Sequence, residues 1–426
     1  MARGEGLYIV SKKTTVESKP ALWSRGFVLA CFIGLFFSMS NRILDSNLAS
    51  FAGDIWSSKT LAGYLTSTYC IGAIVMAFVS GRLVDTKGRR NCLLAGAFLF
   101  GISTLAMAIW PFPAPGLLSR FLQGAFKSVV MVAVSAIVAD VVPKSRMNEG
   151  MGVFNLGNTI AMAIGPMFGL ALVDISGYNL MFFAATACSL LVSVLCAGIN
   201  YEKKTGYISP HMQHQPNINA AEYKGIHKLL EKKVLLYGIN NTISFAGYSC
   251  VLVFVTIYAQ EYLLLNSSQI GFFYTAAAIA MLPVRLFGSK IGDTRGVLFM
   301  IVPGHVCIML MLLILAFFAK GNYPLFLVAG VLYGLGGSSV MPAMNAATVV
   351  DAPAGRAGTA NATFFFMLDF GILFASAIFG RLLDAAHSPQ SGYTQMYMIS
   401  IGISAVSLLM SLVLFNNKAR ERRRAR

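Results

Sequence analysis

Residues 81–90 read GRLVDTKGRR, and residues 289–296 read SKIGDTRG. Each stretch follows a long apolar run, and when the two are aligned their Asp, Thr and Gly coincide, so that Asp293 corresponds to Asp85. Gly88 permits a turn with positive φ, and the surrounding cations are typical of a short loop on the cytoplasmic side of a membrane. The repeat predicts a chain built from two halves of the same topology.

The composition is that of a membrane protein. Of the 426 residues, 56% are hydrophobic and only 12% are charged, whereas a soluble domain carries about 25% charged residues. Apolar runs of roughly 20 residues, each long enough to cross a bilayer, recur along the chain. The sequence therefore predicts an all-α membrane protein with twelve transmembrane helices in two six-helix bundles.

One long polar stretch separates the predicted bundles. We expect a cytoplasmic tail over 1–24, a bundle over 25–200, a linker over 201–233, a bundle over 234–415 and a basic tail over 416–426. The predicted spans lie near 25–46, 60–84, 91–110, 115–141, 148–173, 179–199, 234–260, 268–290, 297–318, 324–349, 358–383 and 393–415.

The distribution of Lys and Arg predicts the orientation. If both termini are cytoplasmic, 26 of the 33 cations lie in cytoplasmic tails and loops and two lie in external loops, as the positive-inside rule requires. This predicts a multi-pass protein of the cell (inner) membrane. The net charge of +16 reflects this topology and not nucleic-acid binding. The other five cations lie within spans: Arg42, Arg120, Lys127, Arg285 and Arg381.

Catalytic and metal-binding patterns are missing from the sequence. The seven cysteines form no CxxC pair, and the histidines of the linker have no regular spacing, so we expect neither disulfides nor a metal. GxSxG and HExxH are also absent, which argues against an enzyme. We expect no cofactor, and as partners a small-molecule substrate, protons and the lipid bilayer around a monomer.

With its motifs the chain resembles the major facilitator superfamily, most closely the branch that exchanges drugs for protons. Residues 81–90 match the family pattern G-x-L-x-D-[RK]-x-G-R-[RK] except at Thr86. The resemblance implies that Asp85 holds the cytoplasmic end of the eleventh span in the outward-facing state. The alternative is a static loop staple. The implied gating residues are Gly81, Asp85, Gly88, Arg89, Arg90 and Asp293.

Two further motifs carry the resemblance. Residues 120–124, RFLQG, are similar to the family's R-x-x-Q-G, whose arginine is tied to proton coupling. Lys127 lies two helical turns beyond Arg120 on the same face; an outward-snorkelling Arg120 is the alternative. The fifth span carries Gly157, Gly165, Pro166 and Gly169, which resemble the antiporter motif G-P-x-x-G and imply an exporter that exchanges its substrate for protons.

Interior carboxylates are the candidate proton carriers. Asp45 on the first span lies at a similar depth to Arg120, and an ion pair of Asp45 with Arg120 or with Arg42 would satisfy both charges. The alternative is that the span ends near residue 42 and leaves Asp45 at the interface. Asp369 in the eleventh span is the second candidate, and Lys127 is a possible partner for it. The predicted proton-coupling residues are Asp45, Arg120 and Asp369.

The resemblance implies that spans 1, 4, 7 and 10 line the substrate cavity. Amides, hydroxyls and cations predominate there, which favours a small polar or amphipathic substrate; the alternative for these groups is hydrogen bonding between helices. We expect Arg285 to anchor loops and His305 to be a packing residue. Rival functions are an organic-anion or sugar-phosphate importer or exchanger and a sensor that does not transport. The predicted substrate-binding residues are Asn41, Arg42, Lys127, Asn240, Asn241, Tyr248, Tyr333 and Asn345.

Overall fold

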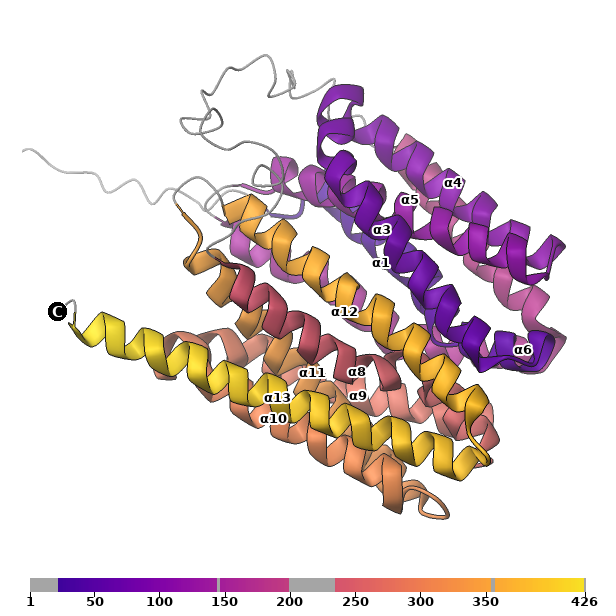
Figure 1. Ribbon diagram of the computed structural model, residues 1–426. Helices are drawn as coiled ribbons and strands as arrows, with labels where there is room; N and C mark the ends of the chain where they lie inside the picture. The colour runs from indigo at the N-terminus through magenta and orange to yellow at the C-terminus, as the bar shows by residue number, and fades with distance from the viewer. Residues whose placement is uncertain (1–21, 144–145, 199–233, 354–356, 425–426) are drawn as a thin grey trace, which may run out of the picture.

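The computed structural model describes residues 22–143, 146–198, 234–353 and 357–424. These residues form helices and contain no strand (Figure 1). The predicted linker and most of the N-terminal tail lie outside them. The helices are α1 (Arg25–Asp45), α2 (Leu48–Trp56), α3 (Lys59–Lys87), α4 (Arg89–Ile109), α5 (Pro113–Val141), α6 (Met147–Ala197), α8 (Leu235–Glu261), α9 (Ser267–Arg295), α10 (Leu298–Leu313), the π-helix η4 (Ile314–Phe318), α11 (Tyr323–Val350), α12 (Ala357–Ala385) and α13 (Pro389–Arg424).

Helix α6 contains two membrane crossings. Its 51 residues would span about 76 Å at a rise of 1.5 Å per residue, far more than the hydrocarbon core of about 30 Å. Ser176 and Gly177 have non-helical dihedral angles, with φ of 76° at Gly177, and divide the helix. The described residues thus hold eleven helices long and apolar enough to cross a membrane, and these make the predicted twelve crossings.

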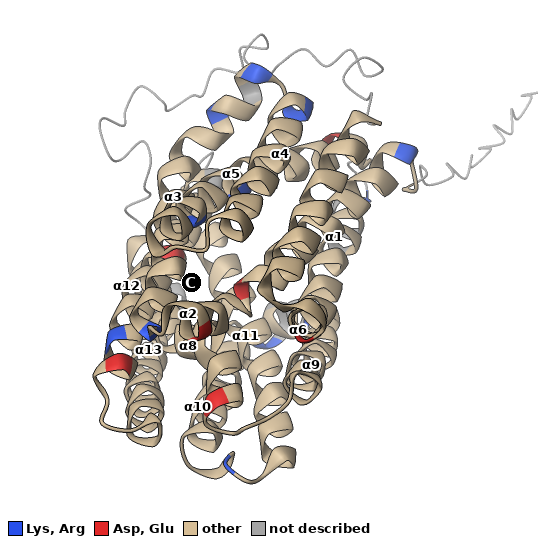
Figure 2. Cartoon of the chain, turned by 90° about the vertical axis from the view of Figure 1, so that its right-hand side faces the viewer, with Lys and Arg blue, Asp and Glu red and all other residues tan. Residues whose placement is uncertain are grey.

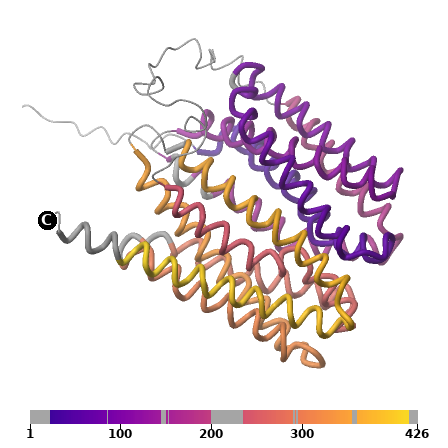
Figure 3. Tube along the Cα trace, viewed as in Figure 1, coloured from indigo at the N-terminus to yellow at the C-terminus, as the bar shows by residue number. Residues whose placement is uncertain are grey.

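An even number of crossings places both ends of the helical chain on one side of the bundle. We call this side the terminal end and the opposite side the distal end. Helices α1–α6 form one half and α8–α13 the other, and α12 runs beside α3 where the halves meet (Figures 1 and 3). The pairing of α6 with α9 forms the second long contact between the halves. Any group on α3, α6, α9 or α12 that faces this junction therefore lies between the halves.

The first span is more complex than the sequence predicted. It ends at Asp45, after which Ser46 and Asn47 interrupt the helix and α2 continues to Trp56. The Ser46 hydroxyl donates to the Arg42 carbonyl at 2.8 Å, and the Asn47 amide donates to the Ile43 carbonyl at 2.7 Å. Such bonds compete with those of the helix backbone. Helix α13 likewise continues through the predicted basic tail as far as Arg424.

The predicted loop at residues 81–90 is mostly helix, which corrects the prediction. Helix α3 continues to Lys87, and only Gly88 turns, with φ of 88°. Gly296 repeats this turn with φ of 94°, as expected from the repeat. Gly81 forms no close helix contact in this conformation, because a Cβ atom there would meet nothing within 4 Å.

Contacts of the two arginines that follow Gly88 tie the N-terminal half together at the terminal end. Arg89 forms an ion pair with Asp140 on α5 and donates to the Ala136 carbonyl at 3.0 Å. Arg90 donates to the Ala197 carbonyl at the end of α6 at 2.8 Å. The side chains of Asp85 and Asp293 lie outside the described part of the structure, so their gating role stays a prediction.

Candidate transport site

An ion pair joins α1 to α5 inside the N-terminal half. Nη2 of Arg120 donates to Oδ1 of Asp45 at 3.0 Å. The Arg120 side chain is 2% exposed and that of Asp45 is 27% exposed, so Arg120 does not snorkel outward. A buried charge is destabilising unless it is paired, and this pair satisfies both. The predicted contact is therefore present, and the structure describes no ion pair of Asp45 with Arg42.

The rest of the motif R-x-x-Q-G holds Arg120 in place. Oε1 of Gln123 accepts a hydrogen bond from Nη1 of Arg120 at 2.8 Å, and the Gln123 amide in turn donates to Thr104 at 3.3 Å. A Cβ atom on Gly124 would overlap the carbonyl oxygen of Tyr69 on α3. The missing side chain thus lets α5 lie directly against α3.

Tyr69 connects the two cations of α5. The centroid of its ring lies 4.2 Å from the Arg120 guanidinium carbon and 4.9 Å from the Lys127 ammonium nitrogen. Its hydroxyl donates to Oδ1 of Asn41 at 2.9 Å. Cation–π contacts are stronger where water is excluded. Sequence reasoning missed Tyr69, whose only signal was a polar-tipped aromatic within a span.

Lys127 faces both candidate proton carriers. It interacts electrostatically with Asp45 of its own half and with Asp369 on α12 of the other half. Both Lys127 and Asp369 are half-buried, and no described ion pair brings their charged atoms within direct contact. The predicted partnership of Lys127 with Asp369 is thus an electrostatic interaction across the junction between the halves and not a direct ion pair among the described contacts.

The charged groups form a row of successive depths along their helices. Arg120 lies seven positions into α5, about 10 Å below its distal end at 1.5 Å per residue. Lys127 lies about 21 Å below that end on the same count, and Asp369 about 24 Å below the distal end of α12. Figure 2 shows how few positions of the helical body carry charge. The row therefore stands out as a possible path for protons through an apolar bundle.

The glycines of the antiporter motif bring α6 against α1. A Cβ atom on Gly165 would lie 2.6 Å from Cβ of Arg42, and one on Gly157 would lie 3.4 Å from Leu35. A Cβ atom on Gly169 would overlap the Asn47 amide, and Pro166 lies within the same stretch of α6. The motif thus fixes the part of α1 that carries Arg42 and Asp45.

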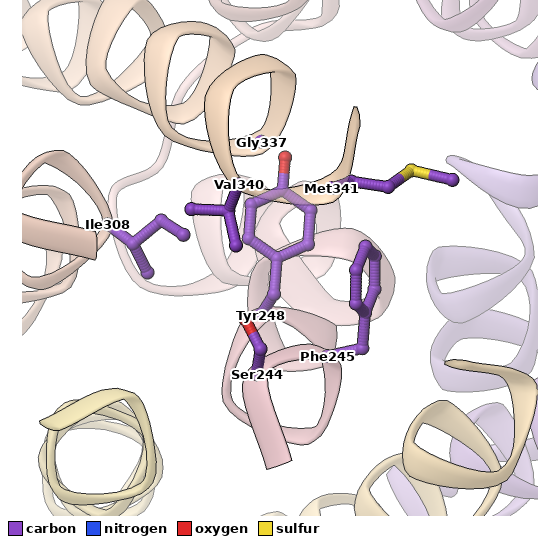
Figure 4. Close-up of a pocket in the computed structure, with 7 residues that line it drawn as sticks. All are labelled: Ser244, Phe245, Tyr248, Ile308, Gly337, Val340 and Met341. Carbon is purple, nitrogen blue, oxygen red and sulfur yellow. The ribbon is translucent and has the colours of Figure 1, made fainter. Parts of the chain in front are cut away.

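Arg42 lies within electrostatic range of tyrosines of the other half. It interacts electrostatically with Tyr248 on α8, Tyr333 on α11 and Tyr274 on α9. The rings of Tyr248 and Tyr333 stack with centroids 4.8 Å apart. Figure 4 shows the Tyr248 hydroxyl directed toward Gly337, beside a cavity of ≈ 10 Å³. That volume holds about one water molecule and no organic substrate.

The polar network around Asn240 binds helices to each other. The Asn240 amide donates to Ser411 at 2.7 Å and accepts from Ser407 at 2.9 Å, both on α13. Ser407 also lies 3.1 Å from Nε2 of His305, which confirms the expected packing role of that histidine. Because Asn240 is fully buried and hydrogen-bonded, the geometry favours a packing role over substrate binding.

Two other predicted amides keep a free oxygen. Asn241 is fully buried and donates to the Phe364 carbonyl on α12 at 3.1 Å, but its Oδ1 atom has no described partner. Oδ1 of Asn345 is buried without a partner as well. Buried acceptors of this kind are destabilising unless a bound group satisfies them, so both residues remain candidates for substrate contact.

Polar contacts join the two halves at the distal end. The Asp384 carboxylate of α12 accepts from the backbone N–H groups of Lys59 at 2.9 Å and Thr60 at 2.7 Å, at the N-terminus of α3. Nζ of Lys59 lies 2.6 Å from Oε2 of Glu261 on α8. A carboxylate at a helix N-terminus is stabilised by the helix dipole. We call Lys59, Thr60, Glu261 and Asp384 the distal closure; sequence reasoning missed it.

Known proteins provide an independent comparison. A model of the Major Facilitator Superfamily matches residues 30–376 and 239–426. An uncharacterized MFS-type transporter of Methanocaldococcus jannaschii is 24% identical, covering 85% of this chain and 91% of that protein. The quinolone resistance protein NorA of Staphylococcus aureus is 21% identical, covering 84% of this chain and 88% of that protein.

Solved structures show the same fold. The nucleoside transporter NupG superposes with a TM-score of 0.73 at 12% identity, covering 92% of this chain and all of that one. Both the family and these relatives are transporters and not enzymes. The chain is therefore a multi-pass membrane transporter and belongs to the Major Facilitator Superfamily.

Proposed function

We propose that this transporter exports a small polar or amphipathic organic molecule from the cytoplasm in exchange for protons. The observation that carries the proposal is the row of interacting groups from Asp45 through Arg120, Tyr69 and Lys127 to Asp369. It links a carboxylate of one half to a carboxylate of the other. Intramembrane carboxylates of this kind are typical proton carriers.

Protonation would act on the ion pair. When Asp45 is protonated, it no longer neutralises the charge of Arg120, and the guanidinium loses its ion-pair partner. Arg120 and Lys127 share the ring of Tyr69, so a movement of one displaces the other. Lys127 would then change its distance from Asp369 across the junction. In this way the binding of a proton favours a different arrangement of the two halves.

The direction of transport is inferred from three features. The Lys and Arg asymmetry supports a cytoplasmic terminal end. The glycines and Pro166 of α6 resemble the antiporter motif, and one relative is named as a quinolone resistance protein. The distal closure then faces the outside, so Asp384 must leave the α3 N-terminus for the substrate to exit. Asp85 would serve the opposite gate.

Reconstituted vesicles test the proposal. The probe is the compound that raises the thermal unfolding midpoint most in a screen of quinolones, organic acids and organic cations. We expect vesicles with an acidic interior to accumulate this compound above its equilibrium level, and collapse of the pH gradient with nigericin to abolish the accumulation. Accumulation of equal size without a gradient would contradict proton coupling. The variant Asp54→Asn removes a carboxylate outside the row and should accumulate the compound like the wild type, because Asp54 bonds only Tyr178 among its described partners.

A further inference from the structure

The charges in the middle of the bundle do not balance. Among the described side chains, four cations and two carboxylates lie within spans away from the helix termini or at the α1–α2 break. Asp45 is matched by Arg120, and Asp369 faces Lys127. The surplus consists of Arg42 on α1 and Arg285 on α9. Arg42 is half-buried and Arg285 is exposed. Uncompensated charge at membrane depth is destabilising, so an anion bound beside them would stabilise this surplus of two cations.

The two surplus cations share one environment. Arg42 interacts electrostatically with Arg285, a like charge from the opposite half. Counted from the distal end of the α1–α2 segment, Arg42 lies about 21 Å deep, and Arg285 lies about 27 Å below the distal end of α9. They therefore differ in depth by roughly one helical turn. Both also lie against α6, where Arg285 donates to Thr159 and Gly165 packs on Arg42, and an anion bound between them would offset their mutual repulsion.

Both guanidinium groups keep N–H donors that the protein does not occupy. Arg42 is half-buried, and the structure describes no hydrogen bond or ion pair of its guanidinium. Arg285 donates to the Thr159 hydroxyl on α6 at 2.5 Å, and among the described residues it has no carboxylate partner. This contact corrects the prediction that Arg285 anchors loops. Both residues retain N–H donors, whose planar arrangement suits the paired oxygens of a carboxylate or phosphate.

Two tyrosines of the second half lie near Arg42. Arg42 lies in the electrostatic reach of Tyr248 and Tyr333, whose stacked rings offer a flat apolar face. The Tyr248 hydroxyl donates to the Tyr333 carbonyl over a long 3.4 Å, so it can turn to another acceptor at little cost. A cationic pair beside stacked phenols suits an anion that carries an apolar or aromatic body.

We infer that Arg42 and Arg285, with Tyr248, bind the carboxylate or phosphate of an anionic organic substrate between the two halves. The inference rests on the proposed function in treating this place as the substrate site. It assigns the anion to Arg285 instead of Lys127, whose charge faces Asp369. Because Arg42 belongs to one half and Arg285 to the other, a bound anion replaces their repulsion with attraction and draws α1 toward α9.

Equilibrium binding to the purified full-length protein tests the inference without any proton gradient. The probes are the anions benzoate and phenyl phosphate, the cation tetraphenylphosphonium and the lipid phosphatidylglycerol, each at matched ionic strength, with thermal unfolding as the readout. We expect both anions to raise the unfolding midpoint of the wild-type protein and the cation to leave it unchanged. Arg42→Gln and Arg285→Gln should each raise the Kd for benzoate about tenfold or more, the loss expected for charge-assisted hydrogen bonds.

Matched controls lie on the same two helices. Arg25→Gln and Arg295→Gln remove exposed cations near the terminal ends of α1 and α9 and should bind benzoate like the wild type. Arg42→Lys keeps the charge but loses the planar fork, so its Kd should lie between those of the wild type and Arg42→Gln; it also decides the matter if Arg42→Gln does not fold. Wild-type affinity in Arg42→Lys, or in Arg285→Gln, would overturn the inference.

Three other outcomes would also overturn it. One is stabilisation by tetraphenylphosphonium but not by the anions. Another is an equal benzoate affinity in all variants. The third is stabilisation by phosphatidylglycerol alone, which would assign the arginines to a lipid headgroup. Proton-driven transport of a cation alongside any of these results would leave the proposed function standing, whereas benzoate binding without gradient-driven transport would remove only the proton coupling.

Discussion

Gly124 on α5 and Gly334 on α11 occupy the same place in the two halves, yet their surroundings differ in charge. A Cβ atom on Gly124 would overlap the carbonyl oxygen of Tyr69, and one on Gly334 would overlap that of Ala277 on α9. The same spacing that separates the two glycines also separates Pro143 from Pro353. The two halves therefore repeat one close helix contact in register.

Side chains around that contact do not repeat. In this register Gly330 stands where Arg120 stands in the first half, and Gly337 stands at the position of Lys127. The room beside Gly337 is taken by Tyr248, whose hydroxyl would lie 2.5 Å from a Cβ atom there. The backbone architecture of this contact is thus shared, whereas its two cations belong to the N-terminal half. This contrast suggests that the Asp45–Arg120 pair is a feature of the first half alone, whereas the matching contact of the second half supplies uncharged packing.

The largest expected effect is the loss of the N-terminal charge pair. Arg120→Gln leaves Asp45 without its cation, and breaking one partner of a buried pair typically destabilises by about 3–5 kcal/mol. We expect a clear fall in the thermal unfolding midpoint in detergent. The double variant Arg120→Gln with Asp45→Asn should recover part of the loss, because no unpaired charge remains. A double variant no more stable than the single one would contradict this assignment.

Adding a methyl group at the repeated helix contact should lower stability by a smaller amount, similar in both halves. Gly124→Ala and Gly334→Ala each place a methyl group against a backbone carbonyl, which no rotamer change relieves, and overpacking of this kind destabilises by about 1–3 kcal/mol. Thermal unfolding measures both. Gly81→Ala is the control, because a Cβ atom there meets nothing within 4 Å. Strong destabilisation in only one half would show that the contacts are not equivalent.

Much of this arrangement follows from local sequence, and the reasons are physical. Apolar length predicted the spans closely, because a helix must cover the bilayer, and the depth of Asp45 and Arg120 along their helices made Arg120 one of the two predicted partners of Asp45, beside Arg42. Ser46 and Asn47 gave no hydropathy signal for the break between α1 and α2. Their side chains interrupt the backbone without changing the apolar character of the segment.

Contacts between distant segments were not predictable from one sequence. Asp384 reaches the N-terminus of α3 from the other half of the chain, and no local pattern distinguishes it from any other residue at a helix end. The role of Tyr69 depends on which face of α3 meets α5. The partners of Arg42 and Arg285 depend on how two separately folded halves meet. Span length and depth were thus predictable, but the rotation of each helix was not.

The smallest expected effect concerns the distal closure. Asp384→Asn removes the charge from the α3 N-terminus, and such capping contacts contribute about 0.5–2 kcal/mol. The population with separated distal ends should therefore grow. Spin labels at Trp110 and Ser388, on distal connections of opposite halves, report this as a longer component in pulsed electron resonance distances. An unchanged distribution, as expected for the control Asp54→Asn, would show that Asp384 does not hold the closure.

Asp45→Asn in reconstituted vesicles tests the assignment of proton coupling to the N-terminal half most directly. Two rates are compared for the same substrate: accumulation against a concentration gradient driven by an acidic interior, and exchange of labelled for unlabelled substrate without any pH gradient. We expect the variant to lose accumulation, with its concentration ratio falling to about one, the value when no driving force acts, while exchange continues. Accumulation at the wild-type level would contradict the role of Asp45.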